Sequence, residues 1–399
     1  MNSAILDELF RGFYIQRWND RIRPMELFEM DKHAHKMIIA FCIAKYEEGN
    51  GRTIDWNDII RSGIYELLRR IIISDIKSPI YREIRKNKEV FLKLNSYVVD
   101  MLEQVIIDKE IKEELKDYLF NGSKNQLSSR ILEAAHIYAS YWEFRIIKNS
   151  NPFSYQNVRI ETELLNDIYK YSDLEGIYKI VNRHTISNFI DLCGQLRFQI
   201  RWAQIPRVPK TSVLGHSMLV ATIAYFISRE NSACPQRLYN NFFGGLFHDL
   251  PEAVTRDIIS PVKSSSQEFE KLLKNLEKEL ADIEIFPLLE PEWTEEIKYF
   301  VINEFSNKIT MDDNTIKTGI SFEEINENYN LDKFKPYDGE IIRVADLLAA
   351  FLEAWNSCSS GIITKDLKSA AKNIKNDLIN KKIGRTDLKT LFLSFDTNF

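Results

Sequence analysis

Apolar residues recur at intervals of three and four through most of this chain, a spacing that places them on one face of an α-helix. Glycine and proline, which interrupt helices, number only 14 and 11 among 399 residues. The pattern therefore predicts a nearly all-α fold. The expected helices cover residues 37–46, 59–73, 89–105, 129–147, 216–227, 242–254, 269–283 and 341–355.

One stretch departs from this pattern. Residues 307–338 are rich in Asn and Asp, and their apolar positions show weak periodicity. Such composition is typical of irregular connections rather than of packed helices. We expect a long loop or insertion there.

Length, charge and cysteine content limit the class of protein. A chain of 399 residues with 44% hydrophobic residues can build two ordinary domain cores. The net charge of −5 and the pI near 5.9 make duplex nucleic acid an unexpected partner and favour a small molecule. The four cysteines form no CxxC pair. Because neither a signal peptide nor an apolar run of about 18 residues is evident, we expect a cytoplasmic protein without membrane contact.

Short segments of the first half recur in the second half in the same order, as in a duplicated unit. The third and fourth matches below share one offset of 182 residues (245 − 63 and 257 − 75). We therefore expect two helical domains, 1–185 and 186–399, in a pseudo-symmetric tandem, with chance similarity between helices as the alternative. The matched pairs are residues 17–18 with 201–202, 35–40 with 216–221, 63–66 with 245–248, 75–79 with 257–261, and 135–137 with 345–347.

Imidazole and carboxylate groups gather in the second half. His248 and Asp249 are adjacent in GGLFHDLPEAV, and Glu252 follows His248 by four residues, which is one helical turn. His216 begins an earlier apolar helix, and Asp346 interrupts a later one, where a buried carboxylate is costly unless paired or bound to metal. A set of His216, His248, Asp249 and Asp346 suits one divalent transition metal ion: Mn, Co, Fe, Ni or Zn.

Each member of this set also has a structural interpretation. His216 alone is typical of a helix start or of a hydrogen-bonded core histidine. Asp346 alone could be the ion-pair partner of Arg343 or Arg201. A lone His-Asp dipeptide is a weak signal, so it is the order His, His-Asp, Asp with Glu252 beside it that favours a metal site.

This order resembles the HD-domain superfamily of metal-dependent phosphohydrolases. In particular, the segments IRWAQIPR, GHS, FHDLPEAVTRDIISPVK and RVADLLAAFLEA, within about residues 196–354, are similar to bacterial HD-domain 5′-deoxynucleotidases. The resemblance implies hydrolysis of deoxynucleoside 5′-monophosphates, with the phosphate at Arg201 and the attacking water near Glu252. It also implies a sugar pocket near Asp257 and Trp202.

The chemistry of phosphate ester hydrolysis requires the same types of residue. A cation must hold a phosphate oxygen and lower the pKa of water. Glu252 can orient or deprotonate that water, and Arg201 can stabilise the charge on the transferred phosphoryl group. Arg207 is a second candidate anion contact, whereas Lys263 is either a phosphate contact or a surface charge.

The corresponding positions of the first half have lost the metal ligands. The His-Asp pair is replaced by Glu66-Leu67, the glutamate by Arg70, and the last aspartate by His136, whereas His35 remains. An improvised site of His33, His35, Glu66 and His136 is the alternative to a half without metal. Because Arg17, Trp18 and Asp75 persist, the first half is expected to be either a scaffold or a nucleotide sensor.

The leading functional hypothesis is an enzyme that removes phosphate from nucleotides. HD sites also suit nucleoside triphosphates, cyclic dinucleotides and single-stranded nucleic acid, so these substrates are alternatives. A nucleotide-sensing regulatory protein is the hypothesis from another class. Because members of the resembled family act as dimers, we expect either a monomeric pseudo-dimer or a homodimer.

Overall fold

The computed structural model describes residues 1–256 and 266–395, and the chain divides into two compact units, Met1–Ile177 and Tyr178–Phe399. The division falls at residue 177 rather than at the expected residue 185. Both units are built from helices, as the apolar spacing predicts, and the described strands form short antiparallel hairpins. The fold class is therefore all-α.

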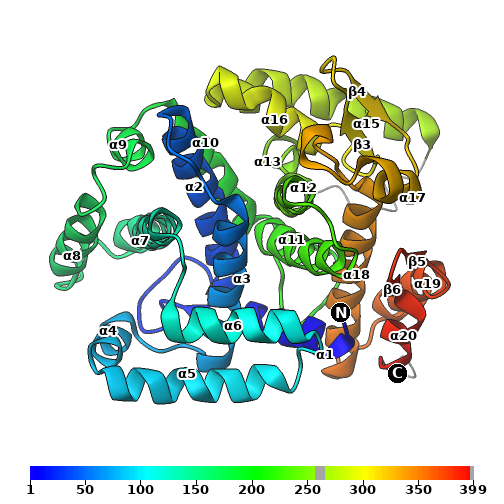
Figure 1. Cartoon of the computed structure of the whole chain (residues 1–399). Helices are drawn as coiled ribbons and strands as arrows, with labels where there is room; N and C mark the ends of the chain where they lie inside the picture. The colour runs from blue at the N-terminus through cyan, green and yellow to red at the C-terminus, as the bar shows by residue number, and fades with distance from the viewer. Residues whose placement is uncertain (257–265, 396–399) are drawn as a thin grey trace. The chain divides into compact units, whose positions relative to one another are not determined.

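The first unit begins with α1 and η1, which are followed by a small hairpin and then by a run of helices (Figure 1). In the hairpin, Gln16 pairs with Phe28 and Arg17 with Leu27. Its elements are α1 (Ser3–Phe10), η1 (Arg11–Phe13), β1 (Gln16–Arg17), β2 (Leu27–Phe28), α2 (Glu29–Gly49), α3 (Trp56–Ile73), α4 (Ser78–Lys86), α5 (Lys88–Glu103), α6 (Lys109–Asn121), α7 (Gln126–Ser150) and α8 (Asn157–Tyr169), with α9 (Glu175–Val181) crossing the division.

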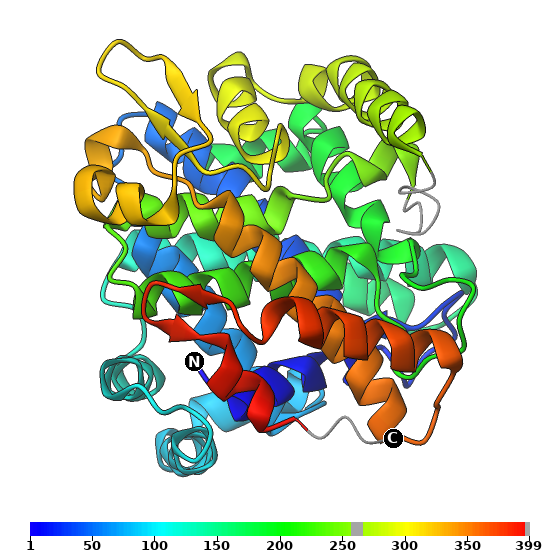
Figure 2. The ribbon, with the colours of Figure 1, turned by 90° about the vertical axis from the view of Figure 1, so that its right-hand side faces the viewer.

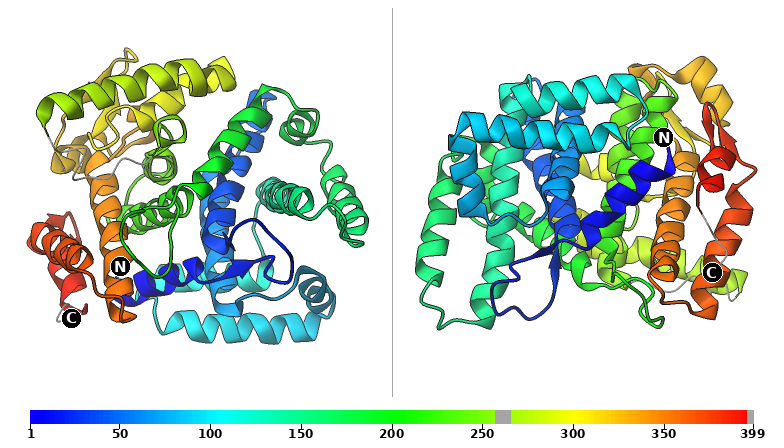
Figure 3. Two further views of the ribbon diagram at one scale, coloured as in Figure 1. Left: turned by 180° about the vertical axis from the view of Figure 1, so that it is seen from behind. Right: turned by 90° about the horizontal axis from the view of Figure 1, so that it is seen from below.

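Helix α2 forms the centre of the first unit. Its residues from Met30 to Ala44 are all buried, which is the pattern of a helix covered on every side. Helices α3 and α7 pack against it, and α8 lies on α7. Side chains cap the neighbouring helices: Asp55 accepts from the backbone N–H of Asp58 at the start of α3, and Asn125 does the same for α7. Helices α5 and α6 lie side by side (Figure 3).

The second unit has the longer series of elements. Helix α15 follows α13 across residues outside the described ranges. Its elements are α10 (Thr185–Gln195), η2 (Leu196–Phe198), α11 (Val213–Glu230), α12 (Pro235–Phe247), α13 (Glu252–Thr255), α15 (Gln267–Leu280), η3 (Ala281–Ile285), η4 (Phe286–Leu288), α16 (Pro291–Val301), β3 (Lys308–Thr310), β4 (Ile316–Thr318), α17 (Phe322–Glu324), η5 (Ile325–Tyr329), η6 (Asp332–Phe334), α18 (Gly339–Ser359), α19 (Lys365–Leu378), β5 (Lys382–Ile383), β6 (Thr386–Asp387) and α20 (Leu388–Leu393).

Helix α11 is the central helix of the second unit. It begins where Ser212 accepts a hydrogen bond from the backbone N–H of Gly215, and every residue from Val213 to Ser228 is buried. Helices α12 and α18 pack on it, and α19 packs on α18 (Figure 2). The approach to α12 is close, because a Cβ at Gly245 would lie 2.8 Å from the Cα of Ala221.

Residues 307–338, for which a long loop or insertion is expected, contain short regular elements. The segment contains the β3–β4 hairpin, α17, η5 and η6, and Ile309, Ile320 and Ile325 form a small buried core of its own. Its elements are short, and their apolar residues follow no single period, so a search for helical or strand periodicity misses them.

A helix that crosses a membrane must be long and apolar. In the described part of the chain, no helix combines the length and apolar character needed to cross a bilayer.

Candidate metal centre

The polypeptide changes direction at the His-Asp pair. Helix α12 ends at Phe247, residues 248–251 form turns, and α13 begins at Glu252. The expected continuous helix over 242–254 is therefore wrong, and Pro251 explains the break because it has no backbone N–H to continue the helical ladder. The backbone N–H of Glu252 instead bonds to the carbonyl of Asp249 at 3.0 Å. His248 and Glu252 are thus brought together by a turn rather than by one helix face.

His248 presents one ring nitrogen to the site. Its Nδ1 lies 2.8 Å from the carbonyl oxygen of Gly245, so that nitrogen carries the proton and donates. The other nitrogen, Nε2, is buried and has no hydrogen-bond partner among the described residues. A carbonyl that fixes the tautomer and leaves Nε2 with a lone pair is the arrangement of a metal-binding histidine.

His216 lies opposite, on α11. It is fully buried, with its Nε2 3.1 Å from Asp346 Oδ1 and its Nδ1 3.4 Å from Glu353 Oε1. Asp346 comes from α18, so three elements supply the cluster. Arg343 contributes only at a distance, with 3.9 Å between its Nη1 and Asp346 Oδ2.

Three of the expected ligands converge on one point. His216, His248 and Asp249 each offer a donor atom within 4.8 Å of the other two, and Asp346 stands against His216. Asp249 Oδ2 lies 3.2 Å from His248 Nε2, and both are buried atoms that make no hydrogen bond within the described residues. Buried polar atoms without partners are costly, so the residues fit a bound divalent cation with nitrogen and oxygen ligands.

The electrostatics of the cluster also favour a positive charge. Burial opposes the charged imidazolium of His248, but the Asp249 carboxylate outweighs this and raises its pKa to about 9. Burial likewise opposes the charged form of Asp346, yet contact with His216 lowers the pKa of this carboxyl. The pocket thus stabilises a cation where the ligand atoms meet.

Glu353 organises the side chains around the cluster. This fully buried residue of α18 accepts hydrogen bonds from Trp202 Nε1 at 2.7 Å, Thr211 Oγ1 at 2.7 Å and Arg201 Nε at 3.3 Å. Burial raises its pKa, but Arg201 reverses this and holds it well below the usual range. Glu353 is not among the site residues predicted from the sequence. Its signal was the spacing of seven residues from Asp346 (353 − 346), which is two helical turns.

Arg201 and Trp202 lie next to the ligands. Arg201 Nη1 is 3.5 Å from Asp249 Oδ2, so its guanidinium reaches from Glu353 to the ligand set. Trp202 has φ of 59°, a conformation that is rare for bulky residues and is found mainly where a site demands it. Glu252 is buried close by, and its backbone carbonyl accepts from Gln199 Nε2 at 2.8 Å.

Three other candidate residues remain predictions. Arg207 is buried and donates to the carbonyl of Pro209 at 2.9 Å and to Thr211, and its expected role as a second anion contact stays a prediction. Asp257 and Lys263 lie outside the described residues.

In the first unit, the corresponding tryptophan and arginine have a similar acceptor. Glu143 accepts from Arg17 Nε at 2.8 Å and from Trp18 Nε1 at 2.9 Å, and Trp18 has φ of 55°. Glu143 also follows His136 by seven residues (143 − 136). Both halves therefore place a glutamate two turns after the last ligand position.

Two lysines of the first unit contact Glu66 and His136, which the sequence aligns with the metal ligands of the second unit. Lys36 contacts Glu66, and Lys32 contacts His136, with both lysines fully buried. Burial lowers the pKa of Lys32 to about 7. Leu67 is buried in the core. Among the described residues of the first unit, no three metal-ligating groups are found together.

Counted from the N-caps of their helices, Lys32 of α2 and His216 of α11 hold the same position. The N-caps Phe28 and Ser212 are separated by 184 residues, and an offset of 184 from Lys32 gives 216. His35 instead packs its ring at 4.9 Å from that of Trp142. The sequence match of residues 35–40 with 216–221 instead aligns the C-terminal ends of the two helices. The two alignments differ because α2 has 21 residues and α11 has 18.

Comparison with known proteins bears on the second unit. Residues 193–375 match the model of the HD domain family. A curated 5′-deoxynucleotidase of Vibrio vulnificus (strain YJ016) is 23% identical over 223 residues, which cover 53% of this chain and 95% of that protein.

The fold, the His-Asp cluster and this match define the class of the second unit. Its residues 193–375 match an HD domain, and this match together with the similarity to a 5′-deoxynucleotidase supports the HD-domain phosphohydrolase family. Members of this family are metal-dependent enzymes, and the described residues offer a His/Asp site for the metal.

Proposed function

We propose that the second unit removes the phosphate of deoxynucleoside 5′-monophosphates with the help of one divalent transition metal ion. The observation that carries the proposal is the convergence of His216, His248 and Asp249 within 4.8 Å, beside the guanidinium of Arg201. The similarity to a 5′-deoxynucleotidase over nearly all of that protein's length supports the choice of substrate.

His216, His248, Asp249 and Asp346 would hold the metal. When bound, a divalent ion neutralises phosphate charge and lowers the pKa of water in its reach. The protein's own contribution is to keep these donors fixed: Gly245 sets the tautomer of His248, and the N-cap at Ser212 fixes the helix that carries His216.

Arg201 would bind the phosphate. Glu353 holds its Nε, which leaves the terminal nitrogens directed to the ligand side, where Nη1 lies 3.5 Å from Asp249. A phosphate oxygen at this position receives a charge-assisted hydrogen bond that strengthens as negative charge builds on the transferred group.

Glu252 would serve as the acid–base group. Its carboxylate is buried at the start of α13, one short turn after the metal ligands, so a water between it and the phosphorus is shielded from bulk solvent. Glu252 takes a proton from that water as its oxygen attacks phosphorus and the P–O bond to the sugar breaks, and Glu252 then gives this proton to the leaving sugar oxygen. Trp202 and Asp257 are proposed to shape the sugar pocket.

We also propose that the protein is cytoplasmic and that it is either a monomeric pseudo-dimer or a homodimer. Both follow from sequence features, namely the unpaired cysteines and the repeated segments.

Phosphate release from a nucleotide panel tests the proposal. The full chain with Mn²⁺ or Co²⁺ is incubated with deoxynucleoside and nucleoside monophosphates, a deoxynucleoside triphosphate, a cyclic dinucleotide and a single-stranded oligonucleotide. We expect the deoxynucleoside monophosphates to be hydrolysed fastest and a chelator to stop the reaction. Preference for any other substrate overturns the specificity, and no hydrolysis of any of them with metal bound overturns the enzymatic proposal.

A further inference from the structure

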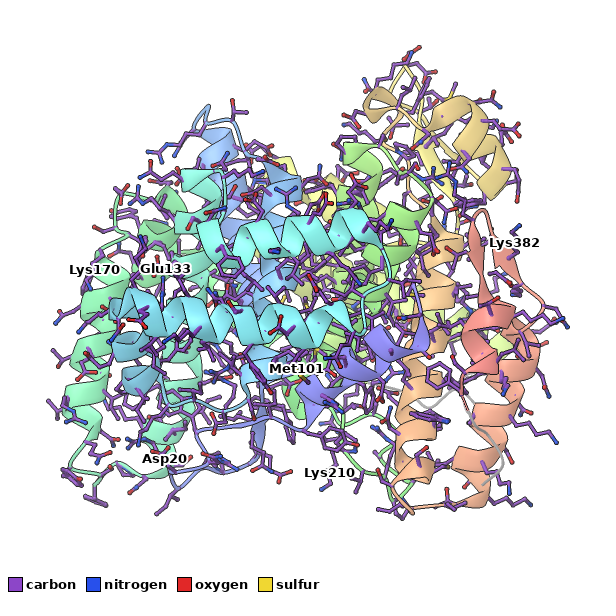
Figure 4. All side chains as sticks on the ribbon, turned by 60° about the horizontal axis from the view of Figure 1, so that its bottom comes forward. Asp20, Met101, Glu133, Lys170, Lys210 and Lys382 are labelled. Atoms are coloured by element: carbon purple, nitrogen blue, oxygen red, sulfur yellow. The ribbon has the colours of Figure 1, made fainter. Side chains whose placement is uncertain are left out.

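The first unit contains a large cavity of its own. It has a volume of about 930 Å³, within the range of small-molecule sites. Asp20, Glu133 and Lys170, which are labelled in Figure 4, line it from the β1–β2 connection, α7 and the end of α8. All residues that line it belong to the first unit.

One face of α3 points polar side chains into this cavity. Ser62, Glu66, Arg69 and Arg70 follow at helical spacing and all line it. By the offset of 182 residues, Glu66 and Arg70 stand where the second unit has His248 and Glu252. The cavity is thus lined by residues that this sequence offset aligns with the metal centre, and these residues offer different chemistry.

The acidic groups at the base of the cavity are already neutralised by the chain. Lys36 contacts Glu66, and Glu29 lies 2.7 Å from Arg17 Nη1 and 3.3 Å from Arg70 Nε. The cluster of the second unit attracts a cation, whereas this one has its own cations and no requirement for another.

Arg69 is a positively charged residue that lines the cavity. No carboxylate lies within ion-pair distance of it in the described part of the chain, and its guanidinium carbon sits 5.9 Å from the centre of the Tyr81 ring. An arginine in such a site offers five N–H donors to an anion in fixed geometry.

Two buried hydroxyl groups of the cavity lining also lack partners among the described residues. Ser62 is 1% exposed, and neither its Oγ nor the hydroxyl of Tyr81 has a hydrogen-bond partner within residues 1–256 and 266–395. Both residues line the cavity. Since buried polar groups nearly always have partners, these hydroxyls point to a polar ligand.

We infer that the first unit binds a nucleotide in this cavity and, without a metal centre, does not hydrolyse it. The phosphate would bind to Arg69, Ser62 and Tyr81. The aromatic rings that also line the cavity, among them Trp18 and Tyr118, suit the flat face of a base. The inference rests on first-unit residues alone, so it does not depend on what the second unit hydrolyses.

Equilibrium dialysis with labelled dAMP in the presence of a chelator tests this inference. The full chain carrying Arg201→Ala is used so that binding in the second unit is weakened. We expect about one dAMP per chain to remain bound, and Arg69→Ala in this background to weaken its affinity about tenfold or more. Arg61→Ala, on the same helix but paired with Asp58 outside the cavity lining, is the control and should leave the affinity unchanged.

Two hydroxyl variants distinguish a lost contact with the ligand from a loss of folding. Because the Ser62 and Tyr81 hydroxyls have no protein partner, Ser62→Ala and Tyr81→Phe should keep the melting temperature and lower dAMP affinity about two- to tenfold. If Arg201→Ala alone abolishes all binding, or if Arg69→Ala and both hydroxyl variants bind dAMP as tightly as the background, the inference is overturned.

Discussion

Glu353 shows how much of the proposed site depends on a residue that touches neither metal nor substrate. It is fully buried and connects Arg201, Trp202 and Thr211, and it lies 3.4 Å from His216. A carboxylate behind a metal-binding histidine orients the ring and increases its basicity. Glu353 is therefore a positioning residue for both the phosphate contact and one ligand.

Replacing Glu353 with glutamine tests this role. The amide keeps the shape but loses the charge that holds Arg201, so we expect KM for the deoxynucleotide to rise about tenfold while the metal content stays near wild type. Steady-state kinetics and elemental analysis measure the two effects. Glu340→Gln, an exposed change on the same helix, is the control. An unchanged KM would mean that Glu353 has only a structural role.

Glu252→Gln separates chemistry from metal binding. If Glu252 moves the proton of the attacking water, the amide should lower kcat by about 10²-fold or more with little change in bound metal. Rapid phosphate-release assays at saturating substrate measure kcat. Turnover at the wild-type rate would contradict the acid–base assignment.

At the scale of elements, the site depends on the close packing of α11 and α12. His216 lies on the first helix and His248 directly follows the second, so the distance between the helices sets the distance between the ligands. Gly245 permits the approach, because its missing side chain would meet the Ala221 backbone. Its carbonyl also holds His248.

Gly245→Ala should therefore damage stability and metal binding together. The added methyl group must push the helices apart, at a cost of about 1–3 kcal/mol, and should weaken metal affinity by moving the ligands. Thermal unfolding and metal titration measure these effects. In Gly49→Ala, the control, the new Cβ meets nothing within 4 Å. A Gly245→Ala protein with unchanged melting temperature and metal affinity would contradict this account of the packing.

The sequence predicted long elements better than short ones. Helical spacing located α2, α3, α7, α11 and α18, because each buries apolar residues over several turns. It missed the turn after Phe247, although Pro251 was visible, and it missed the small core of Ile309, Ile320 and Ile325 because no single period joins short elements.

The ligand set itself was predictable from residue types, but its supporting residues were not. Imidazole and carboxylate groups on apolar helices stand out in a sequence. Glu353 and Lys32 do not, since their roles depend on which side chains face them across the helices. The sequence matched His35 with His216, whereas a count from the helix N-caps aligns Lys32 with His216.

For the whole molecule, the two units share features that support a duplication. Gln16 pairs with Phe28 in the first unit, and Ile200 pairs with Ser212 in the second, at one offset of 184 residues. The tryptophan–glutamate hydrogen bond occurs in both. We propose that the first unit is a copy in which lysines replaced the metal, so that binding and hydrolysis are divided between the units.

The metal content of the purified chain tests this division most directly. Elemental analysis should find about one divalent transition metal ion per chain in the wild-type protein and almost none in Asp249→Ala, because that variant removes a ligand from the only complete set of the described residues. Glu66→Gln, at the corresponding position to His248 in the first unit, should retain about one. Two ions per chain, or full metal content in Asp249→Ala, would contradict the account.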